Sequence, residues 1–106
     1  MYHERQIHGE GGGKMYLRTE PLDFIVGEKK YVQFEIISTK NEKVVITEAT
    51  YTIAHDGELF TSGSCEVEEN IMQFLAEMNE YGVYDVEVTY KVAPEVRKAR
   101  CRINVR

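Results

Sequence analysis

The sequence predicts an all-β fold, an antiparallel β-sandwich of about seven strands. Apolar and polar residues alternate along most of the chain after residue 15, which is typical of strands with one buried face. Polar or glycine-containing turns separate these runs at spacings that suit hairpins. The chain has 106 residues, enough for one domain with a two-layer core.

The clearest strand is KYVQFEIIS, residues 30–38, in which alternate residues share one face. The residues of that face are Val32, Phe34 and Ile36. The preceding run DFIVGEKK, residues 23–30, reads as a short strand that breaks at Gly27. The polar segment STKNEK, residues 38–43, then predicts a turn.

Asp56-Gly57 predicts a hairpin, because this dipeptide favours tight turns between strands. The strand before it, residues 44–55, is rich in β-branched residues. Its expected buried residues are Ala49, Tyr51 and Ile53. The strand after it is expected over residues 58–67, with Thr61, Gly63, Cys65 and Val67 on one face.

The segment Ile71–Met78 fits two patterns. A helical stripe would consist of Ile71, Phe74, Leu75 and Met78, whereas a strand would bury Met72, Phe74 and Ala76. Because the segment is short for a helix and its neighbours are strands, we favour a strand.

Two further strands complete the pattern. Residues 82–92 alternate strictly, with Tyr84, Val86, Val88, Tyr90 and Val92 on one face. Ala93-Pro94-Glu95 predicts a turn, and residues 98–105 form the last expected strand. Its expected inner residues are Ala99, Cys101, Ile103 and Val105, with Arg100, Arg102, Asn104 and Arg106 facing outward.

Charge and hydropathy exclude several classes of partner. The net charge is −5, with 13 Lys and Arg against 18 Asp and Glu, the wrong sign for a typical nucleic-acid binder. No run approaches the roughly 18 apolar residues of a membrane helix. The first ten residues lack the apolar segment of a secretory signal. We therefore expect no nucleic-acid or membrane partner and a protein that is cytoplasmic when made.

The chemistry-bearing residues predict neither an enzyme nor a cofactor site. The histidines His3, His8 and His55 show no metal-ligand spacing, and two cysteines are too few for a structural zinc site. We expect Cys65 and Cys101 to be reduced, buried thiols. A glycosidase pair or a calcium site needs carboxylates that converge on one point. The sequence shows no such convergence among the acidic residues Glu66, Glu68, Glu69, Glu77, Glu80 and Asp85.

The stretch HGEGGGK, residues 8–14, allows three interpretations. A phosphate loop needs G-x-x-x-x-G-K-[ST], but His8 stands at its first glycine and Met15 replaces Ser or Thr. A linker suits the flexibility of glycine. The third is that codons for this run form a ribosome-binding site and that Met15 is the true start. We expect residues 1–14 to be disordered and residues 15–106 to form the domain.

The stretch EYGVYDV, residues 80–86, resembles the tyrosine corner of immunoglobulin-like domains. In that family a Tyr at the start of strand F hydrogen-bonds back to nearby backbone, and here Gly82, Tyr84 and Val86 occupy the matching positions. The run FIVGEKKYVQFEI is similar to the first two strands of many bacterial modules of this kind. The resemblance covers about residues 20–106 and implies an immunoglobulin-like sandwich.

The chain departs from the antibody pattern, because Val86 replaces the strand F cysteine and no Trp is present. A further resemblance is to small structural proteins of prophages in Gram-positive bacteria, which are short, acidic and signal-less. It implies a non-enzymatic phage or prophage virion component, of the tail, neck or capsid decoration, that binds other virion proteins or itself. The alternative is a carbohydrate- or ligand-binding sandwich of a bacterial surface system.

The candidate partner-binding residues form a basic cluster and two tyrosines. The basic cluster consists of Arg97, Lys98, Arg100, Arg102 and Arg106, expected on the outer face of the last strand and the turn before it. It could contact an acidic partner, or it could pair across strands with Glu35, Glu87 and Asp85. Tyr31 and Tyr81 are expected to be exposed, and exposed aromatic residues are enriched at interfaces.

Overall fold

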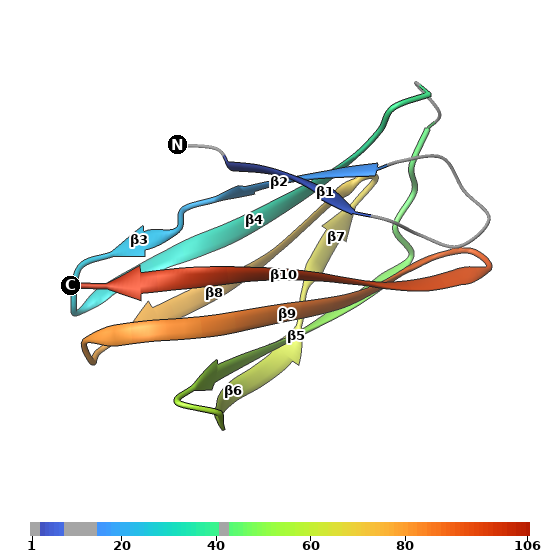
Figure 1. Ribbon diagram of the computed structural model, residues 1–106. Coiled ribbons are helices and arrows are strands. Elements are labelled where there is room, and N and C mark those ends of the chain that lie inside the picture. Colours follow the sequence, from blue (N-terminus) through green and yellow to red (C-terminus); the bar gives the residue numbers. More distant parts are fainter. Residues whose placement is uncertain (1–2, 8–14, 41–42) are drawn as a thin grey trace.

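The computed structural model describes residues 3–7, 15–40 and 43–106 and contains ten strands in two five-stranded sheets (Figure 1). The first sheet has the order β1 (His3–Ile7), β2 (Met15–Glu20), β4 (Glu28–Ser38), β8 (Ile71–Met78) and β7 (Glu66–Glu68). The second has the order β3 (Asp23–Phe24), β10 (Glu95–Val105), β9 (Gly82–Val92), β5 (Glu48–His55) and β6 (Glu58–Ser64). Neighbouring strands are antiparallel except β3 and β10, which are parallel. The predicted all-β sandwich is confirmed.

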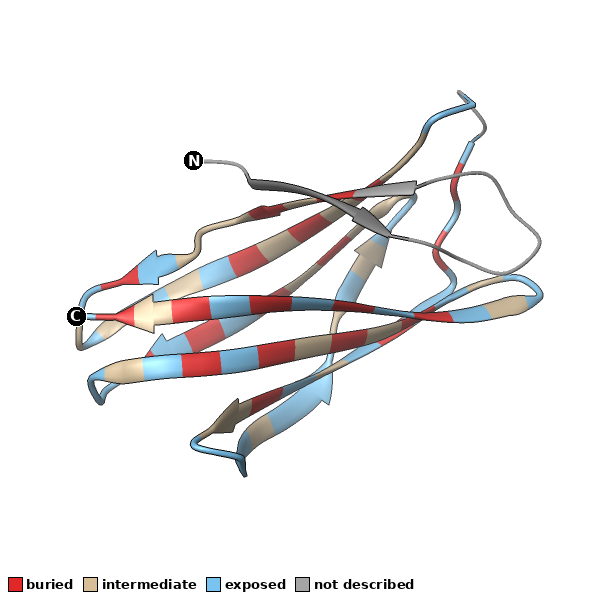
Figure 2. Ribbon diagram, in the orientation of Figure 1, coloured by how far each residue is buried: buried red, intermediate tan, exposed pale blue. Residues whose placement is uncertain are grey.

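The core lies between the two sheets, where alternate residues of the long strands are buried (Figure 2). In β4 these are Val32, Phe34 and Ile36, as their alternation predicts. In β9 they are Tyr84, Val86, Val88 and Tyr90, while Val92 is half-buried. The rings of Tyr51 and Phe74, one from each sheet, stack with centroids 3.9 Å apart and link the layers.

The segment Ile71–Met78 is a strand, and the expected residues Met72, Phe74 and Ala76 are buried together with Met78. It pairs with β4 on one side and with β7 on the other. Residues of a strand that is paired on both sides follow a period of two, so Ile71 and Leu75 of the helical stripe lie on the face of the sheet away from the core.

The hairpin at Asp56-Gly57 is confirmed: His55 pairs with Glu58, and both turn residues have positive φ angles, 53° and 79°. The strand before it begins at Glu48 rather than at residue 44. The strand after it is not continuous over residues 58–67. The chain leaves the second sheet after Ser64 and resumes as β7 in the first sheet at Glu66, so Cys65 lies where it changes sheet.

The last hairpin is longer than predicted, because β10 begins at Glu95, directly after the turn, and pairs with β9 along its whole length. This start brings Arg97 into the strand. Odd-numbered residues of β10 face the core, so Arg97 is buried instead of lying in an exposed turn. Its place in an exposed basic cluster was therefore wrongly predicted.

The N-terminal segment differs in part from the expected disorder. Residues 3–7 form β1, an antiparallel neighbour of β2 in which Ile7 pairs with Met15. Residues 1–2 and 8–14, and with them the stretch HGEGGGK, lie outside the described residues. The hypothesis that Met15 is the true start stays a prediction.

The arrangement of the strands is immunoglobulin-like. The order β2-β4-β8-β7 opposite β10-β9-β5 corresponds to the ABED and GFC sheets of that fold, with β9 in the place of strand F. The Tyr84 hydroxyl donates a hydrogen bond of 3.1 Å to the main-chain oxygen of Glu80, as in a tyrosine corner. The corner formed by Gly82, Tyr84 and Val86 therefore holds the start of β9.

Candidate functional site

The charged outer surface of β9 and β10 is the strongest candidate site. We name it the charged face, and it consists of Asp85, Glu87, Lys98, Arg100 and Arg102. The even-numbered residues of β10 point away from the core, which places its three basic residues side by side on the outer surface of the sheet. Three of the five residues of the predicted basic cluster are thus brought together.

The charged face is organised by cross-strand ion pairs. Arg100 lies opposite Glu87 and Arg102 opposite Asp85 in the register of the two strands. The Nε of Arg100 donates a hydrogen bond of 2.7 Å to Oε2 of Glu87, and the Nε of Arg102 donates one of 3.1 Å to Asp85. Lys98 Nζ lies 3.4 Å from the other oxygen of Glu87. The predicted pairing with Glu87 and Asp85 is therefore confirmed, whereas Glu35 pairs with Arg18.

These contacts change the ionisation of Glu87. The hydrogen bond from Arg100, with the nearby charge of Lys98, lowers the pKa of Glu87 below its ordinary value. The arginines remain accessible in spite of their pairing, since their side chains are 72% and 70% exposed. Exposed ion pairs contribute little to stability, so these groups can reorient toward another protein at small cost.

A shallow hollow of about 780 Å³ adjoins these pairs on the same surface. On β5 it is lined by the small residues Thr52 and Ala54. On β9 and β10 it is lined by Asp85, Val86, Glu87, Arg100, Cys101 and Arg102. Because short side chains of β5 lie beside long ones of β9 and β10, the surface is lower over β5. Thr52 and Ala54 were not predicted from the sequence, because only the pairing of β5 with β9 brings them beside the ion pairs.

Arg97 does not belong to the charged face. Its side chain is 6% exposed and its Nη2 pairs with the carboxylate of Glu95. Its Nε and Nη1 are buried and have no hydrogen-bond partner among the described residues, and the same holds for the hydroxyl of Tyr90. Tyr90 lies directly opposite Arg97 on β9.

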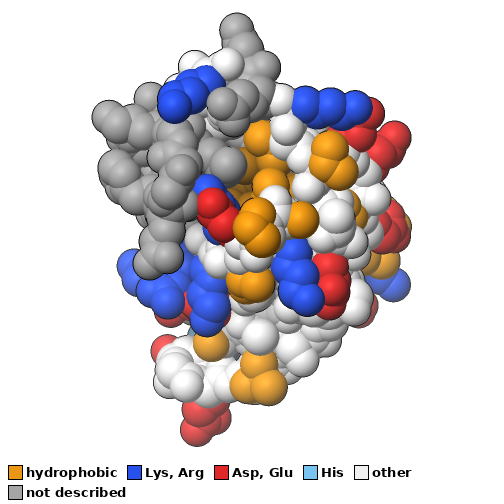
Figure 3. Space-filling view, turned by 90° about the vertical axis from the view of Figure 1, so that its right-hand side faces the viewer, with side chains coloured by type: hydrophobic (Ala, Val, Ile, Leu, Met, Phe, Trp, Pro, Cys, Tyr) orange, Lys and Arg blue, Asp and Glu red, His pale blue; other side chains and the backbone are white. Residues whose placement is uncertain are grey.

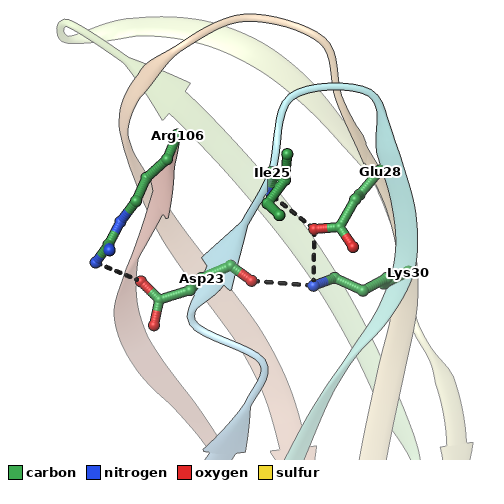
Figure 4. A network of polar contacts seen from close by, with 5 residues as sticks. All are labelled: Asp23, Ile25, Glu28, Lys30 and Arg106. Atoms are coloured by element: carbon green, nitrogen blue, oxygen red, sulfur yellow. Dashed lines mark hydrogen bonds and ion pairs between the residues drawn. The ribbon is translucent and has the colours of Figure 1, made fainter.

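Arg106 directly follows β10 and pairs with Asp23 of β3 (Figure 4). Its Nη2 lies 3.4 Å from Oδ1 of Asp23, while Lys30 bridges the main-chain oxygen of Asp23 and the carboxylate of Glu28. The amide of Ile25 donates a 2.6 Å hydrogen bond to Glu28, and this bond, with Lys30, lowers the pKa of Glu28. Arg106 thus belongs to a network that fastens β3 and the following turn, and it does not line the hollow.

The predicted tyrosines are exposed but lie on other elements. Tyr31 is 48% exposed on the outer surface of the first sheet, directly opposite Leu75, which is 42% exposed. Tyr81 is 74% exposed in the turn between β8 and β9. Neither lines the hollow. Leu75 was missed because the ambiguous period of Ile71–Met78 left its direction open.

The described part of the chain contains no cluster of cysteine, histidine or acidic side chains that would suit catalysis or metal binding. Cys65 and Cys101 are free thiols, half-buried and buried respectively, and burial raises the pKa of Cys65 to about 11. The ring of His55 stacks on Tyr84 with centroids 4.3 Å apart. No three His, Cys, Asp or Glu residues among those described could hold a metal ion. The same residues include no helix long and apolar enough to cross a membrane.

Acidic and basic side chains are mixed over the end of the molecule that Figure 3 presents, with hydrophobic side chains between them. The charges there do not gather into one field of a single sign.

Comparison with known proteins supports the fold alone. No protein-family model matches the chain, and a search of curated proteins finds no match. Among solved structures, an engineered protein matches 100% of the chain with 7% identity and a TM-score of 0.65. An endo-β-1,4-mannanase from Thermotoga petrophila matches 87% of it with 9% identity and a TM-score of 0.57. The chain spans 20% and 19% of the length of these two proteins.

The CARDB domain of a Pyrococcus furiosus protein, whose structure was solved in complex with di-metal ions, is similar over a comparable length. It shares 16% identity with the chain at a TM-score of 0.53, and the match covers 85% of this chain and 84% of that domain. At such identities the similarity shows a shared β-sandwich architecture. The chain is an immunoglobulin-like β-sandwich.

Proposed function

We propose that the chain is a non-enzymatic, protein-binding module that uses its charged face to contact a partner protein. The observation that carries this proposal is the hollow beside the accessible ion pairs of Arg100 and Arg102. Acidic groups of a partner can form ion pairs with Arg100 and Arg102 in place of the pairs within the chain. Basic groups of the partner can then contact Asp85 and Glu87. Such complementary charge sets the orientation and partner choice of an interface.

The strands that carry the charged face are firmly packed. It lies on β9 and β10, whose inner residues Val86, Val88, Ala99 and Ile103 are buried in the core. The two strands pair over eleven residues each. A backbone that is already ordered loses little conformational entropy on binding, which favours a scaffold that meets neighbours in a fixed geometry.

The setting that we propose is a phage or prophage virion, in which the module would belong to a tail, neck or capsid decoration. The support is the resemblance of this short, acidic chain to small prophage structural proteins. Repeated contacts through a fixed surface allow rings and lattices to close by symmetry.

The alternative, carbohydrate binding, has less support. A platform for sugar rings needs aromatic side chains in a row, and the hollow is lined by none of the exposed aromatic residues. Tyr31 and Tyr81 lie on other elements. We therefore place the protein-binding role first.

The test is to co-express the chain with the products of the genes that adjoin its own and to measure complexes by size-exclusion chromatography. We expect a complex with a virion protein, lost in the double variant Arg100→Glu/Arg102→Glu. The matched control is Arg106→Glu, which reverses an exposed, ion-paired arginine outside the hollow and should bind normally. Neighbouring genes for cell-wall or metabolic proteins, or a complex that survives the double reversal, would refute the proposal. Binding to a glycan array in its place would favour the alternative.

A further inference from the structure

Strand β6 is exposed along almost its whole length. It pairs only with β5 and forms one edge of the second sheet, with no described strand beyond it (Figure 1). Every residue of β6 except Thr61 is exposed, so both of its faces meet solvent. An edge strand in this state offers unpaired main-chain groups to another strand.

Two large apolar side chains lie on this exposed strand. Leu59 is 67% exposed and Phe60 is 44% exposed. The Phe60 ring packs edge-to-face with the buried ring of Tyr84, with centroids 5.3 Å apart, and part of it remains at the surface. Apolar side chains next to an open strand edge are the features that a partner strand covers.

Charge distinguishes β6 from the other edges. β7 has three residues, of which Glu66 and Glu68 are acidic, and β1 contains Glu4 and Arg5. β3 has two residues and pairs only with Asn104 and Val105 of β10. The rest of β10 is therefore also an edge, and it carries the basic side chains of the charged face. β6 is seven residues long and has one charged residue, Glu58, at its first position. It is thus the one described edge that is both long and almost uncharged.

The chemistry of β6 favours a second copy of the same chain. Each copy carries a net charge of −5, so two copies repel each other unless they meet where charge is lowest. An antiparallel pair of identical strands has equal lengths, and it places the two Glu58 side chains at opposite ends of the pairing. After the bulge at Phe60, the residues from Thr61 to Ser64 continue as regular strand, which a second strand can pair with at the usual spacing of about 4.8 Å.

We propose that β6 pairs in antiparallel fashion with β6 of a second copy, forming a symmetric dimer with one continuous sheet across both molecules. The contact is isologous, since each copy offers the same strand. This inference concerns the edge of the sheet and does not depend on a partner for the charged face. The charged faces of both copies would lie on the same side of the joined sheet and remain open.

The test is sedimentation equilibrium of the full chain, up to about 1 mM, with variants that add a charge. We expect wild type to reach twice the monomer mass as its concentration rises. Ser62→Lys places two lysines near each other across the symmetry axis and should raise the dimer Kd by about tenfold or more. The control is Thr50→Lys, an equally exposed hydroxyl residue of β5, one strand in from the edge, which should leave the Kd unchanged.

Amide hydrogen exchange supplies a second measurement on the same samples. Amides of β6 that point away from β5 should become protected as the dimer forms, and they should lose this protection in Ser62→Lys. A chain that stays monomeric at the highest concentration would overturn the proposal. A dimer that leaves the β6 amides unprotected, or that tolerates Ser62→Lys as well as Thr50→Lys, would overturn it too.

Discussion

The Tyr84 hydroxyl bonds to the main-chain oxygen of Glu80, four residues earlier, at 3.1 Å. This contact fastens the turn between β8 and β9 to the start of β9. Replacing the tyrosine by Phe removes the hydroxyl and keeps the buried ring, so the carbonyl loses its partner. We expect Tyr84→Phe to lower the free energy of unfolding by about 1 kcal/mol, measured by urea denaturation.

Tyr90 provides the matched control, because its hydroxyl is buried without a hydrogen-bond partner among the described residues. Burial also raises the pKa of Tyr90. Removing an unpaired buried hydroxyl relieves a desolvation penalty, so Tyr90→Phe should leave stability unchanged or raise it. Equal losses in the two variants would contradict the assignment of the Tyr84 bond.

Gly82 is expected to be intolerant of a side chain. Its φ angle is +136°, and a Cβ atom there would lie 2.7 Å from Nε2 of His55. The ring of His55 is itself held against Tyr84. Gly82→Ala should therefore combine about 1–3 kcal/mol of backbone strain with a displacement of His55. Thermal unfolding and the resonances of the His55 ring would report the two effects separately.

A substitution at Gly27 separates the backbone strain from the contact with His55. Its φ angle of +94° also disfavours a side chain, but no atom lies within 4 Å of the added Cβ. Gly27→Ala should show the strain alone and lose less stability than Gly82→Ala. Similar losses in the two variants would mean that His55 moves aside freely.

The period-two pattern predicted the long strands well because each has one face in the core. Residues 82–92 show this most clearly, and the tyrosine corner was predicted from three residues of the same strand. The pattern was less informative where the chain leaves a regular sheet. The sheet change at Cys65 is not marked by a break in alternation, so one strand was expected where there are two.

The candidate site was only partly predictable for a similar reason. Lys98, Arg100 and Arg102 follow from alternation along one strand. The hollow depends on the pairing of β5 with β9, a contact between residues far apart in sequence that alternation does not specify. Arg97 was misplaced because an arginine next to a predicted turn was expected at the surface, whereas β10 begins two residues before it.

The pair of Glu87 and Arg100 predicts a pH dependence of stability. The folded state lowers the pKa of Glu87 from its ordinary value of 4.5, so the ionised carboxylate stabilises the fold above that pH. The contribution is lost as the pH falls through the lower, folded-state pKa. Thermal unfolding from about pH 6 to about pH 3 should show a steeper loss in wild type than in Glu87→Gln. Arg100→Gln removes the donor and should flatten the profile in the same way, and an unchanged profile in both variants would contradict the pairing.

Cys65 should react slowly with alkylating reagents. Burial raises the pKa of its thiol from 9.0 to about 11, and the thiolate is the reactive form. At about pH 8 the folded protein should hold roughly a hundredfold less Cys65 thiolate than the unfolded chain. Iodoacetamide labelling followed by mass spectrometry can assign the rate to Cys65 and to the buried Cys101. Equal labelling rates for Cys65 in the folded and unfolded protein would contradict its half-buried position.

Replacing the buried side chain of Arg97 is expected to raise the stability of the protein, whereas most substitutions of buried residues lower it. Its Nε and Nη1 are buried without hydrogen-bond partners in the described part of the chain, which costs stability. Its acidic partner Glu95 keeps 33% of its side chain exposed, so the carboxylate can be hydrated when the guanidinium is removed. The usual large penalty for breaking a buried ion pair, a stranded charge in the core, should therefore not arise.

Arg97→Met keeps a long side chain at this site and removes its unpaired donors. We expect this variant to raise the free energy of unfolding by about 1 kcal/mol, measured by urea denaturation. Arg97→Lys keeps a buried charge but gives up the geometry of the guanidinium, and it should be less stable than wild type. A clear loss of stability in Arg97→Met would contradict this prediction, because it would mean that the pair with Glu95 contributes more than the unpaired donors cost.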